Sequence, residues 1–267
     1  MNLTRKWIAV VFRGTVGLSD INTDRNFNLD YDSFFKSQDD VSVPEGKPGT
    51  HEGFTSYLTD PKKGVQDGRA CIDRIITCVN EEFKNNKDVV GKDFKLFVTG
   101  HSLGGGLANL FAFKCAQLKA KNDESVSHLP GKIRAMTFAA PAVGNGDYNK
   151  EFQALEKKGV LRHIRIANEG DVVPTNGIFF PLSLAFKGNT HEYVQNGVNF
   201  FLRPEKELVI DYGNTKSCAS QFHGTGSLPI HGLDEYEKRL HLPENKKFYQ
   251  QNVEDIYEAA CGFSNKE

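Results

Sequence analysis

Hydrophobic residues occur along the chain in two alternating patterns, short apolar runs of strand length and longer stretches with apolar residues at helical spacing. The run Trp7–Phe12 is continuous and ends in Arg13-Gly14-Thr15, as expected for a central parallel strand that leads into a functional loop. Further strands are predicted at 94–98, 133–139 and 160–167, and amphipathic helices at 65–84, from 103 onward and at 146–158. Strands that alternate with helices predict a mostly parallel sheet.

Three other segments complete this pattern. Residues 16–63 are mostly polar with embedded aromatic residues, and we expect a long loop that is either a lid or disordered. The apolar runs 200–202 and 208–210 flank a polar turn and predict an antiparallel hairpin at the far edge of the sheet. Two helices close the chain, at about 231–241 and 246–260. The 267 residues fit a single α/β domain, 1–267, with a mostly parallel central sheet flanked by helices.

Composition and charge exclude several classes of function. A formal net charge of −1 and a pI of about 6.7 provide no field for steering onto nucleic acid or anionic lipid, so nucleic-acid binding is not expected. No signal peptide and no transmembrane segment is recognisable, since the longest apolar run near the start is the strand-sized 7–12. The sequence contains no signal for an oligomeric state.

The five cysteines are an odd number without C-x-x-C spacing, which indicates neither a metal site nor a complete disulfide framework. Cys71 and Cys78 share a face of the predicted helix two turns apart, about 10 Å, which is too far for a bridge. A pair between Cys218 and Cys261 has no supporting pattern. An unpaired thiol favours a reducing, intracellular compartment.

The most specific local signal is Gly100-His101-Ser102-Leu103-Gly104, which lies between the predicted strand at 94–98 and the helix that follows. A serine between two glycines at such a junction is typical of a nucleophile elbow, where a tight turn exposes the hydroxyl at the end of a strand. We interpret Ser102 as the nucleophile. Folds with this elbow usually place several strands before it, so the single clear strand here predicts a missing segment before Met1.

A serine hydroxyl needs a base that takes its proton and a carboxylate that orients the base. In α/β hydrolases the order along the chain is serine, acid, histidine. Asp171 follows the strand at 160–167 and a glycine turn, which favours it as the acid. Glu169 and Asp211 remain competitors, because a single aspartate or glutamate is more often a solvated surface group.

Eight histidines compete for the role of base. His231 follows the last predicted strand and precedes a helix, which is the expected position. His223 and His241 lie in the same region and remain alternatives. His51 and His191 lie before the hairpin, where a structural role fits better.

Negative charge develops on the substrate oxygen during acyl transfer, and backbone N–H groups that already point at it stabilise the transition state. Leu103 directly follows the nucleophile and supplies one such donor. The second is expected in the loop after an earlier strand, and Thr15 is the candidate there, with a hydroxyl that also contributes. The apolar segment 176–186 after the acid fits an acyl-binding site and ordinary core equally well.

Six ordered segments, spread over most of the chain, share their motifs with a known family: 11–15, 51–54, 99–105, 140–145, 168–174, and His231 with Tyr236. Together they resemble the lipase class 3 family of α/β hydrolases, the fungal triacylglycerol lipases and related plant lipases. The resemblance implies an α/β-hydrolase fold with Ser102, Asp171 and His231 as catalytic triad and with Thr15 and Leu103 as oxyanion donors. It also implies lipid ester substrates at a lipid–water interface, no metal or organic cofactor, and a structural role for His51.

The chain departs from the family pattern in two places. Ala142 stands where the family usually has an arginine, and the lid region after Thr15 lacks the tryptophan often found there. The family's usual N-terminal portion is also absent, which predicts uncovered apolar sheet surface.

The most direct reading of these residues is a serine hydrolase that cleaves carboxylic esters of acylglycerols or related lipids through an acyl-enzyme on Ser102. A feruloyl-type or short-chain esterase uses the same machinery, and chain-length preference separates the two. A non-catalytic relative that binds lipid or protein is the alternative from another class, because a fold does not establish a function. A complete set of candidate triad residues argues against it.

Overall fold

The computed structural model describes residues 1–2, 4–14, 28–32, 34–35, 46–63, 67–87, 94–174, 193–204, 206, 208–212, 228–245 and 253–261. Its main sheet has the strand order β1-β4-β5-β7-β9-β10, and all neighbours are parallel except the β9–β10 pair. The strands are β1 Trp7–Phe12, β4 Lys95–His101, β5 Ile133–Phe138, β7 Leu161–Asn168, β9 Val198–Leu202 and β10 Val209–Tyr212. The predicted mostly parallel sheet and its terminal hairpin are confirmed.

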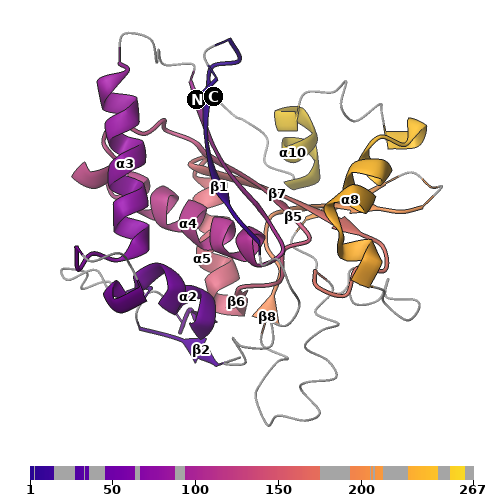
Figure 1. Cartoon of the computed structure of the whole chain (residues 1–267), viewed down its shortest axis with the longest axis horizontal. Helices are drawn as coiled ribbons and strands as arrows, with labels where there is room; N and C mark the ends of the chain where they lie inside the picture. Colours follow the sequence, from indigo (N-terminus) through magenta and orange to yellow (C-terminus); the bar gives the residue numbers. More distant parts are fainter. Residues whose placement is uncertain are drawn as a thin grey trace.

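Helices cover both faces of this sheet (Figure 1). One face carries α3 Cys71–Asn85, α4 Leu103–Ala120 and α5 Gly146–Lys157, and the other carries α8 Leu233–Leu240 and α10 Val253–Cys261. Because side chains alternate along a strand, β5 contributes to two cores. Ile133 and Ala135 pack in the core of α3 and α4, whereas Met136 and Phe138 contact the core of α8 and α10.

A small second sheet lies beside the main one and consists of β2 Leu29–Asp30, β3 Thr50–His51, β6 Gly144–Asn145 and β8 Tyr193–Val194. β3 leads directly into α2 Glu52–Thr59, which the sequence interpretation missed inside the stretch predicted to be mostly loop. The pattern was weak because this eight-residue helix buries only Phe54 and Leu58 among its large apolar residues. Of the stretch predicted to be either a lid or a disordered loop, residues 16–27 and 36–45 lie outside the described residues.

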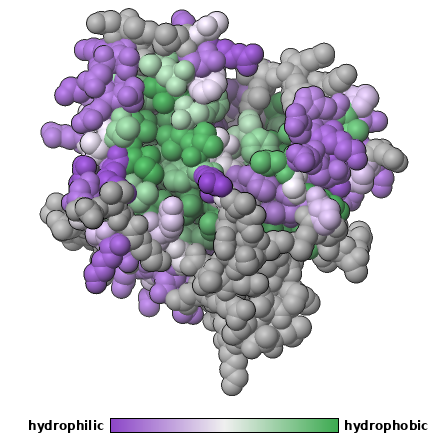
Figure 2. Space-filling view, viewed as in Figure 1, coloured by the Kyte–Doolittle hydropathy of each residue, from purple (hydrophilic) through white to green (hydrophobic). Residues whose placement is uncertain are grey.

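β1 lies at an edge of the described sheet and not at its centre, so the prediction from its continuous apolar run is wrong. Ile8 and Phe12 are buried, but Val11 is 69% exposed. Figure 2 shows hydrophobic residues gathered around this edge. An apolar run indicates a strand, but it cannot reveal whether that strand has one neighbour or two.

The helices α4, α5 and α8 lie close to their predicted bounds. α10 ends close to its predicted end, and its predicted start at about 246 lies outside the described residues. The helix predicted from residue 65 begins at Cys71, because Gly68 adopts a φ of +71° that no helix allows. Short 3-10 turns complete the described elements: η1 Pro61–Lys63, η2 Glu124–Val126, η4 Leu228–His231 and η5 Pro243–Asn245.

Four described cysteines, Cys71, Cys78, Cys115 and Cys261, are free thiols, and Cys218 lies outside the described residues. None of the helices within the described ranges is long and apolar enough to cross a membrane.

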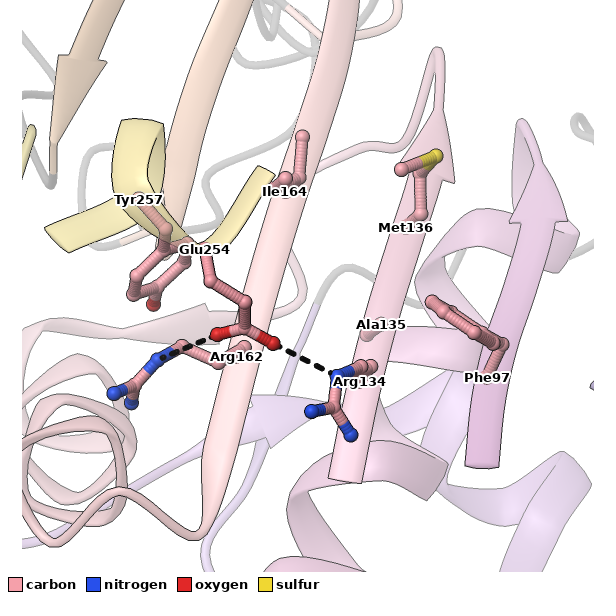
Figure 3. A pocket seen from close by; sticks show the side chains of 8 residues that line it. All are labelled: Phe97, Arg134, Ala135, Met136, Arg162, Ile164, Glu254 and Tyr257. Atoms are coloured by element: carbon pink, nitrogen blue, oxygen red, sulfur yellow. Dashed lines mark hydrogen bonds and ion pairs between the residues drawn. The ribbon is translucent and has the colours of Figure 1, made fainter. Parts of the chain in front are cut away.

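A charged cluster fastens α10 to the sheet (Figure 3). Glu254 of α10 accepts a hydrogen bond of 2.9 Å from Nε of Arg134, and its other oxygen lies 3.8 Å from Nε of Arg162. The Arg162 guanidinium also lies 5.0 Å from the ring centroid of Tyr257. Phe97, Met136 and Ile164 line the apolar side of the small pocket beside these groups.

Glu156, near the end of α5, lies fully buried next to this cluster. Its carboxyl group accepts hydrogen bonds from the hydroxyls of Tyr257 and Tyr212, the latter at 2.8 Å. Burial raises the pKa of Glu156 to about 7, against the opposing effect of the two tyrosines and Arg162. One carboxyl group thus joins α5, β10 and α10.

Candidate active site

Ser102 occupies the tight turn between β4 and α4 that the sequence predicts. Its φ of 57° and ψ of −126° are strained for a residue with a side chain. Added Cβ atoms at Gly100 and Gly104 would come within 2.2 Å of the Gly104 carbonyl oxygen and 2.3 Å of the Phe12 carbonyl oxygen, respectively. Only glycine fits these two positions, so the turn keeps strand and helix in close contact and the serine at its tip.

The three residues predicted as a triad lie in hydrogen-bond contact, although they come from distant parts of the chain. Oγ of Ser102 lies 2.8 Å from Nε2 of His231, and Nδ1 of His231 lies 3.0 Å from both carboxylate oxygens of Asp171. A carboxylate only accepts, so Nδ1 carries the proton and Nε2 is left to accept from the serine hydroxyl. The arrangement can transfer the serine proton to the imidazole.

Of the three residues, the base in the middle of the series is the least buried. Asp171 is fully buried, Ser102 is 4% exposed, and the His231 side chain is 12% exposed. The imidazole is therefore the group of the three that solvent or a substrate reaches most easily, which suits a group that must exchange protons.

Tyr236 of α8 supports the acid, and the sequence interpretation assigned it no role. Its hydroxyl donates to Oδ2 of Asp171 at 2.7 Å and accepts from the backbone N–H of Asn168 at 3.0 Å. The backbone N–H of Val173 donates to Oδ1 at 3.0 Å. These donors satisfy a carboxylate that has no access to water. The position of Tyr236 five residues after His231 was the available signal, but spacing alone does not reveal this contact.

The turn η4, which carries His231, is held by side chains from two strands. Nε2–H of His101 donates to the carbonyl oxygen of His231 at 2.8 Å, and Nδ2–H of Asn168 donates to the carbonyl oxygen of Ile230 at 3.2 Å. The two imidazole rings of His101 and His231 lie 4.7 Å apart between centroids. Burial, with a smaller effect of His231, lowers the pKa of His101 and so favours its neutral form.

One of the two expected oxyanion donors lies in the described part of the chain. Leu103 is the first residue of α4, so its N–H has no acceptor inside the helix and remains available beside Ser102. Thr15 lies outside the described residues. The end of β1 nevertheless reaches the elbow, since a Cβ at Gly14 would lie 2.6 Å from the carbonyl oxygen of His101.

The residues that competed for the acid and base have other surroundings. Asp211 lies on β10 at the far edge of the sheet, where Oδ1 accepts from the N–H of Tyr212 at 2.8 Å. Glu169 precedes the glycine turn, and its backbone N–H donates to the carbonyl of Leu202 at 2.8 Å. Of these three carboxylates, Asp171 is therefore the one that is bonded to His231.

Among the histidines, Nδ1 of His241 binds the carbonyl oxygen of Glu237 at the end of α8, at 2.8 Å. Nδ1 of His51 accepts from the N–H groups of Gly53 and Phe54 at 3.1 and 3.4 Å, and so caps α2 as a structural residue. His191, His223 and the apolar segment 176–186 lie outside the described residues. Within the described ranges, no three His, Cys, Asp or Glu side chains gather as metal ligands.

Comparisons with known proteins identify the family and the fold of this chain. The family model "Lipase (class 3)" matches residues 9–179. Phospholipase A1-Igamma2, chloroplastic, of Arabidopsis thaliana is 29% identical over 181 residues, which are 66% of this chain and 32% of that protein. Galactolipase DONGLE, chloroplastic, of the same plant is 24% identical over 249 residues, 92% of this chain and 47% of that protein. The chain thus spans about a third to about half of the length of these relatives.

Solved structures share the fold. A Rhizomucor miehei lipase propeptide complex superposes with a TM-score of 0.56 at 22% identity, over 85% of this chain and 59% of that one. Lipase II from Rhizopus niveus superposes with a TM-score of 0.55 at 23% identity, over 85% of this chain and 70% of that one. The fold is therefore that of the fungal lipases, and because the family model covers more than half of the residues, the chain belongs to the lipase (class 3) family.

Proposed function

We propose that this protein is a serine hydrolase that cleaves carboxylic ester bonds of acylglycerols or related lipids. The observation that carries the proposal is the continuous series of hydrogen bonds from Ser102 through His231 to Asp171 at the tip of a strained turn. A serine, an imidazole and a buried carboxylate in this order form the arrangement that activates a hydroxyl for acyl transfer.

The geometry supports a two-step reaction. In the first step Oγ of Ser102 attacks the ester carbonyl carbon while Nε2 of His231 takes the hydroxyl proton. The same proton then passes to the departing alcohol oxygen, and an acyl group stays on the serine. In the second step His231 takes a proton from water, the resulting hydroxide oxygen attacks the acyl carbon, and the carboxylic acid leaves as Ser102 regains its proton. Asp171 orients the imidazole and stabilises its charged form throughout.

The second requirement of the reaction is that the negative charge on the carbonyl oxygen is stabilised in the transition state. We assign the N–H of Leu103 as one donor to this oxygen, and the N–H and hydroxyl of Thr15 as the other. Each such donor is typically worth about 3 to 4 kcal/mol of transition-state stabilisation. The close approach of Gly14 to the elbow supports this assignment, because Thr15 is the next residue along the chain.

The substrate class follows from the family and not from a pocket. Relatives named phospholipase A1 and galactolipase indicate acyl esters of glycerolipids with polar head groups, and the fungal neighbours are triacylglycerol lipases and other lipases. We therefore propose a lipid ester as substrate, presented at a lipid–water interface.

Hydrolysis assays test the proposal directly. Purified protein is given p-nitrophenyl esters from acetate to palmitate, and emulsions of phosphatidylcholine, monogalactosyldiacylglycerol and triacylglycerol. We expect activity that rises with chain length and falls by about 10⁴-fold or more in Ser102→Ala. Ser127→Ala, at an exposed position remote from the turn, is the matched control and keeps full activity.

Two outcomes would change the conclusion. Activity confined to short soluble esters would favour a feruloyl-type or short-chain esterase. A folded protein without serine-dependent hydrolysis of any of these esters would favour a non-catalytic relative that binds lipid or protein.

A further inference from the structure

Two successive backbone carbonyls of the turn that carries the base accept hydrogen bonds from side chains of other elements. Asn168 donates to the carbonyl of Ile230, and His101 donates to the carbonyl of His231. Carbonyls at the end of a short 3-10 turn lack donors within that turn and need partners from outside it. Here both donors belong to residues that lie more than 60 positions before the turn in the sequence.

The two donors come from the two strands that carry the other candidate catalytic groups. His101 ends β4 and directly precedes Ser102, whereas Asn168 ends β7 and lies three residues before Asp171. The turn of His231 is therefore tied once to the strand of the nucleophile and once to the strand of the acid. A displacement of the turn relative to either strand would stretch one of these two hydrogen bonds.

We propose that His101 and Asn168 act as a pair of positioning residues that hold the His231 turn at the distance required by both Ser102 and Asp171. This inference rests on the proposed function, and it assigns to two residues a role in that reaction beyond the triad and the oxyanion donors. Neither residue touches the reacting atoms. Each acts through the backbone of the base.

The chemistry of His101 fits this role. Its Nε2 must carry a proton to donate to a carbonyl, and a neutral imidazole does so without placing a second positive charge beside His231. The rings lie only 4.7 Å apart, so a charged His101 would oppose the charge that His231 acquires during catalysis. Burial lowers the pKa of His101 and keeps the ring in the required neutral form.

The environment of Asn168 is also suited to positioning. The residue is fully buried, and its backbone N–H donates to the same Tyr236 hydroxyl that binds Asp171. The backbone N–H of Asp171 in turn donates to the carbonyl of Asn168 at 3.1 Å. Asn168 therefore contacts the acid, the supporting tyrosine and the base turn at once, and it cannot move without changing their spacing.

The test compares four single variants of the full chain, and the double variant that combines His101→Phe with Asn168→Leu. His101→Phe keeps the ring but removes the donor, and His101→Gln restores an N–H at a similar reach. Asn168→Leu keeps the size of the side chain without its donor. His241→Phe is the matched control, because it removes another imidazole-to-carbonyl hydrogen bond of 2.8 Å on α8.

The first readout is independent of catalysis. Nuclear magnetic resonance of protein labelled with ¹⁵N-histidine reports the Nδ1–H proton of His231 that is bonded to Asp171, assigned by its absence in His231→Gln. We expect this signal to weaken in His101→Phe and in Asn168→Leu and to disappear in the double variant. It stays unchanged in His101→Gln and in the control. Thermal unfolding of the same samples shows that each remains folded.

The second readout is the hydrolysis of a soluble p-nitrophenyl ester. Misplacing a reacting group by about 1 Å costs about 100-fold in rate, so each single variant should lose about tenfold in kcat, with KM changed less than twofold. The double variant should lose more than the product of the two single losses, because in each single variant the other hydrogen bond still holds the turn. His101→Gln should keep kcat within about threefold of the original protein.

The outcomes separate this inference from the proposed function. A double variant that keeps both the His231 signal and kcat, or one whose losses follow only the fraction of unfolded protein, would overturn the positioning role. An original protein without ester hydrolysis, in which the His231 signal still depends on His101 and Asn168, would overturn the proposed reaction and leave the positioning geometry supported.

Discussion

In the described part of the chain, two fully buried carboxyl groups accept hydrogen bonds from tyrosine hydroxyls, Asp171 and Glu156. Asp171 lies near the carboxyl end of β7 and also accepts from the imidazole of His231. Glu156 lies near the end of α5, and its two side-chain donors are Tyr212 and Tyr257. Both carboxyl groups are buried, and both accept a hydrogen bond from a tyrosine hydroxyl. The second side-chain donor is an imidazole for Asp171 and another tyrosine hydroxyl for Glu156.

This difference separates a buried carboxylate of the proposed active site from one with a structural role. Burial raises the pKa of Tyr212 and Tyr257, so these hydroxyls stay protonated and pass no proton on at neutral pH. An imidazole can gain and lose a proton near neutrality, and His231 connects the buried acid to the hydroxyl of Ser102. Buried carboxyl groups with tyrosine partners are therefore not in themselves a sign of catalysis.

The largest expected effect comes from making the same change in both regions. Asp171→Asn places an amide where His231 needs an acceptor, which favours the wrong tautomer and should lower kcat by about 10⁴-fold. Glu156→Gln should leave kcat within about twofold. Steady-state kinetics on one soluble ester measures both, and equal losses in the two variants would remove the distinction between the regions.

The second effect concerns stability and belongs to Glu156. Its folded-state pKa of about 7 lies above its ordinary value of 4.5, so the folded protein holds a proton that the unfolded chain has lost. Stability from this group is fully present below pH 4.5 and is lost as the pH rises through 7, by about 3 kcal/mol in all. Urea unfolding between pH 4.5 and 8.5 should show this decline.

In Glu156→Gln, which stays neutral at every pH, the same decline should be absent. The comparison with the original protein cancels the contributions of other titrating groups. Parallel pH curves for the two proteins would mean that Glu156 does not carry a proton in the folded state.

The smallest effect comes from the tyrosines of the two regions. Tyr236→Phe removes a donor to Asp171 and leaves the buried N–H of Asn168 without its partner, at a cost of about 1 to 3 kcal/mol in stability. We expect a loss of about tenfold in kcat/KM because the acid is less firmly held. Tyr257→Phe should leave kcat/KM unchanged, and a loss there as large as in Tyr236→Phe would contradict the assignment.

The sequence predicted the elements of the fold well where the chain itself determines them. The strands of the main sheet and α5 lie close to their predicted bounds, because apolar periodicity directly reflects which side chains are buried. β1 was predicted at the centre of the sheet but lies at the edge of the described sheet, and α2 was missed. Neighbours in a sheet and a short helix docked by two large side chains depend on packing that periodicity does not describe.

By itself, the sequence determined the family, the parallel sheet and the strained turn of Ser102, because the apolar strand, the glycine at 100 and the helix after the serine follow one another along the chain. Only the tertiary structure decided which carboxylate and which histidine meet that serine. Their contacts join residues 60 and 129 positions apart, and chain order favoured Asp171 and His231 but left Glu169, Asp211, His223 and His241 as alternatives. The same holds for Tyr236, His101 and Asn168, since a hydrogen bond between distant residues depends on the packing of whole helices against the sheet and leaves no local pattern.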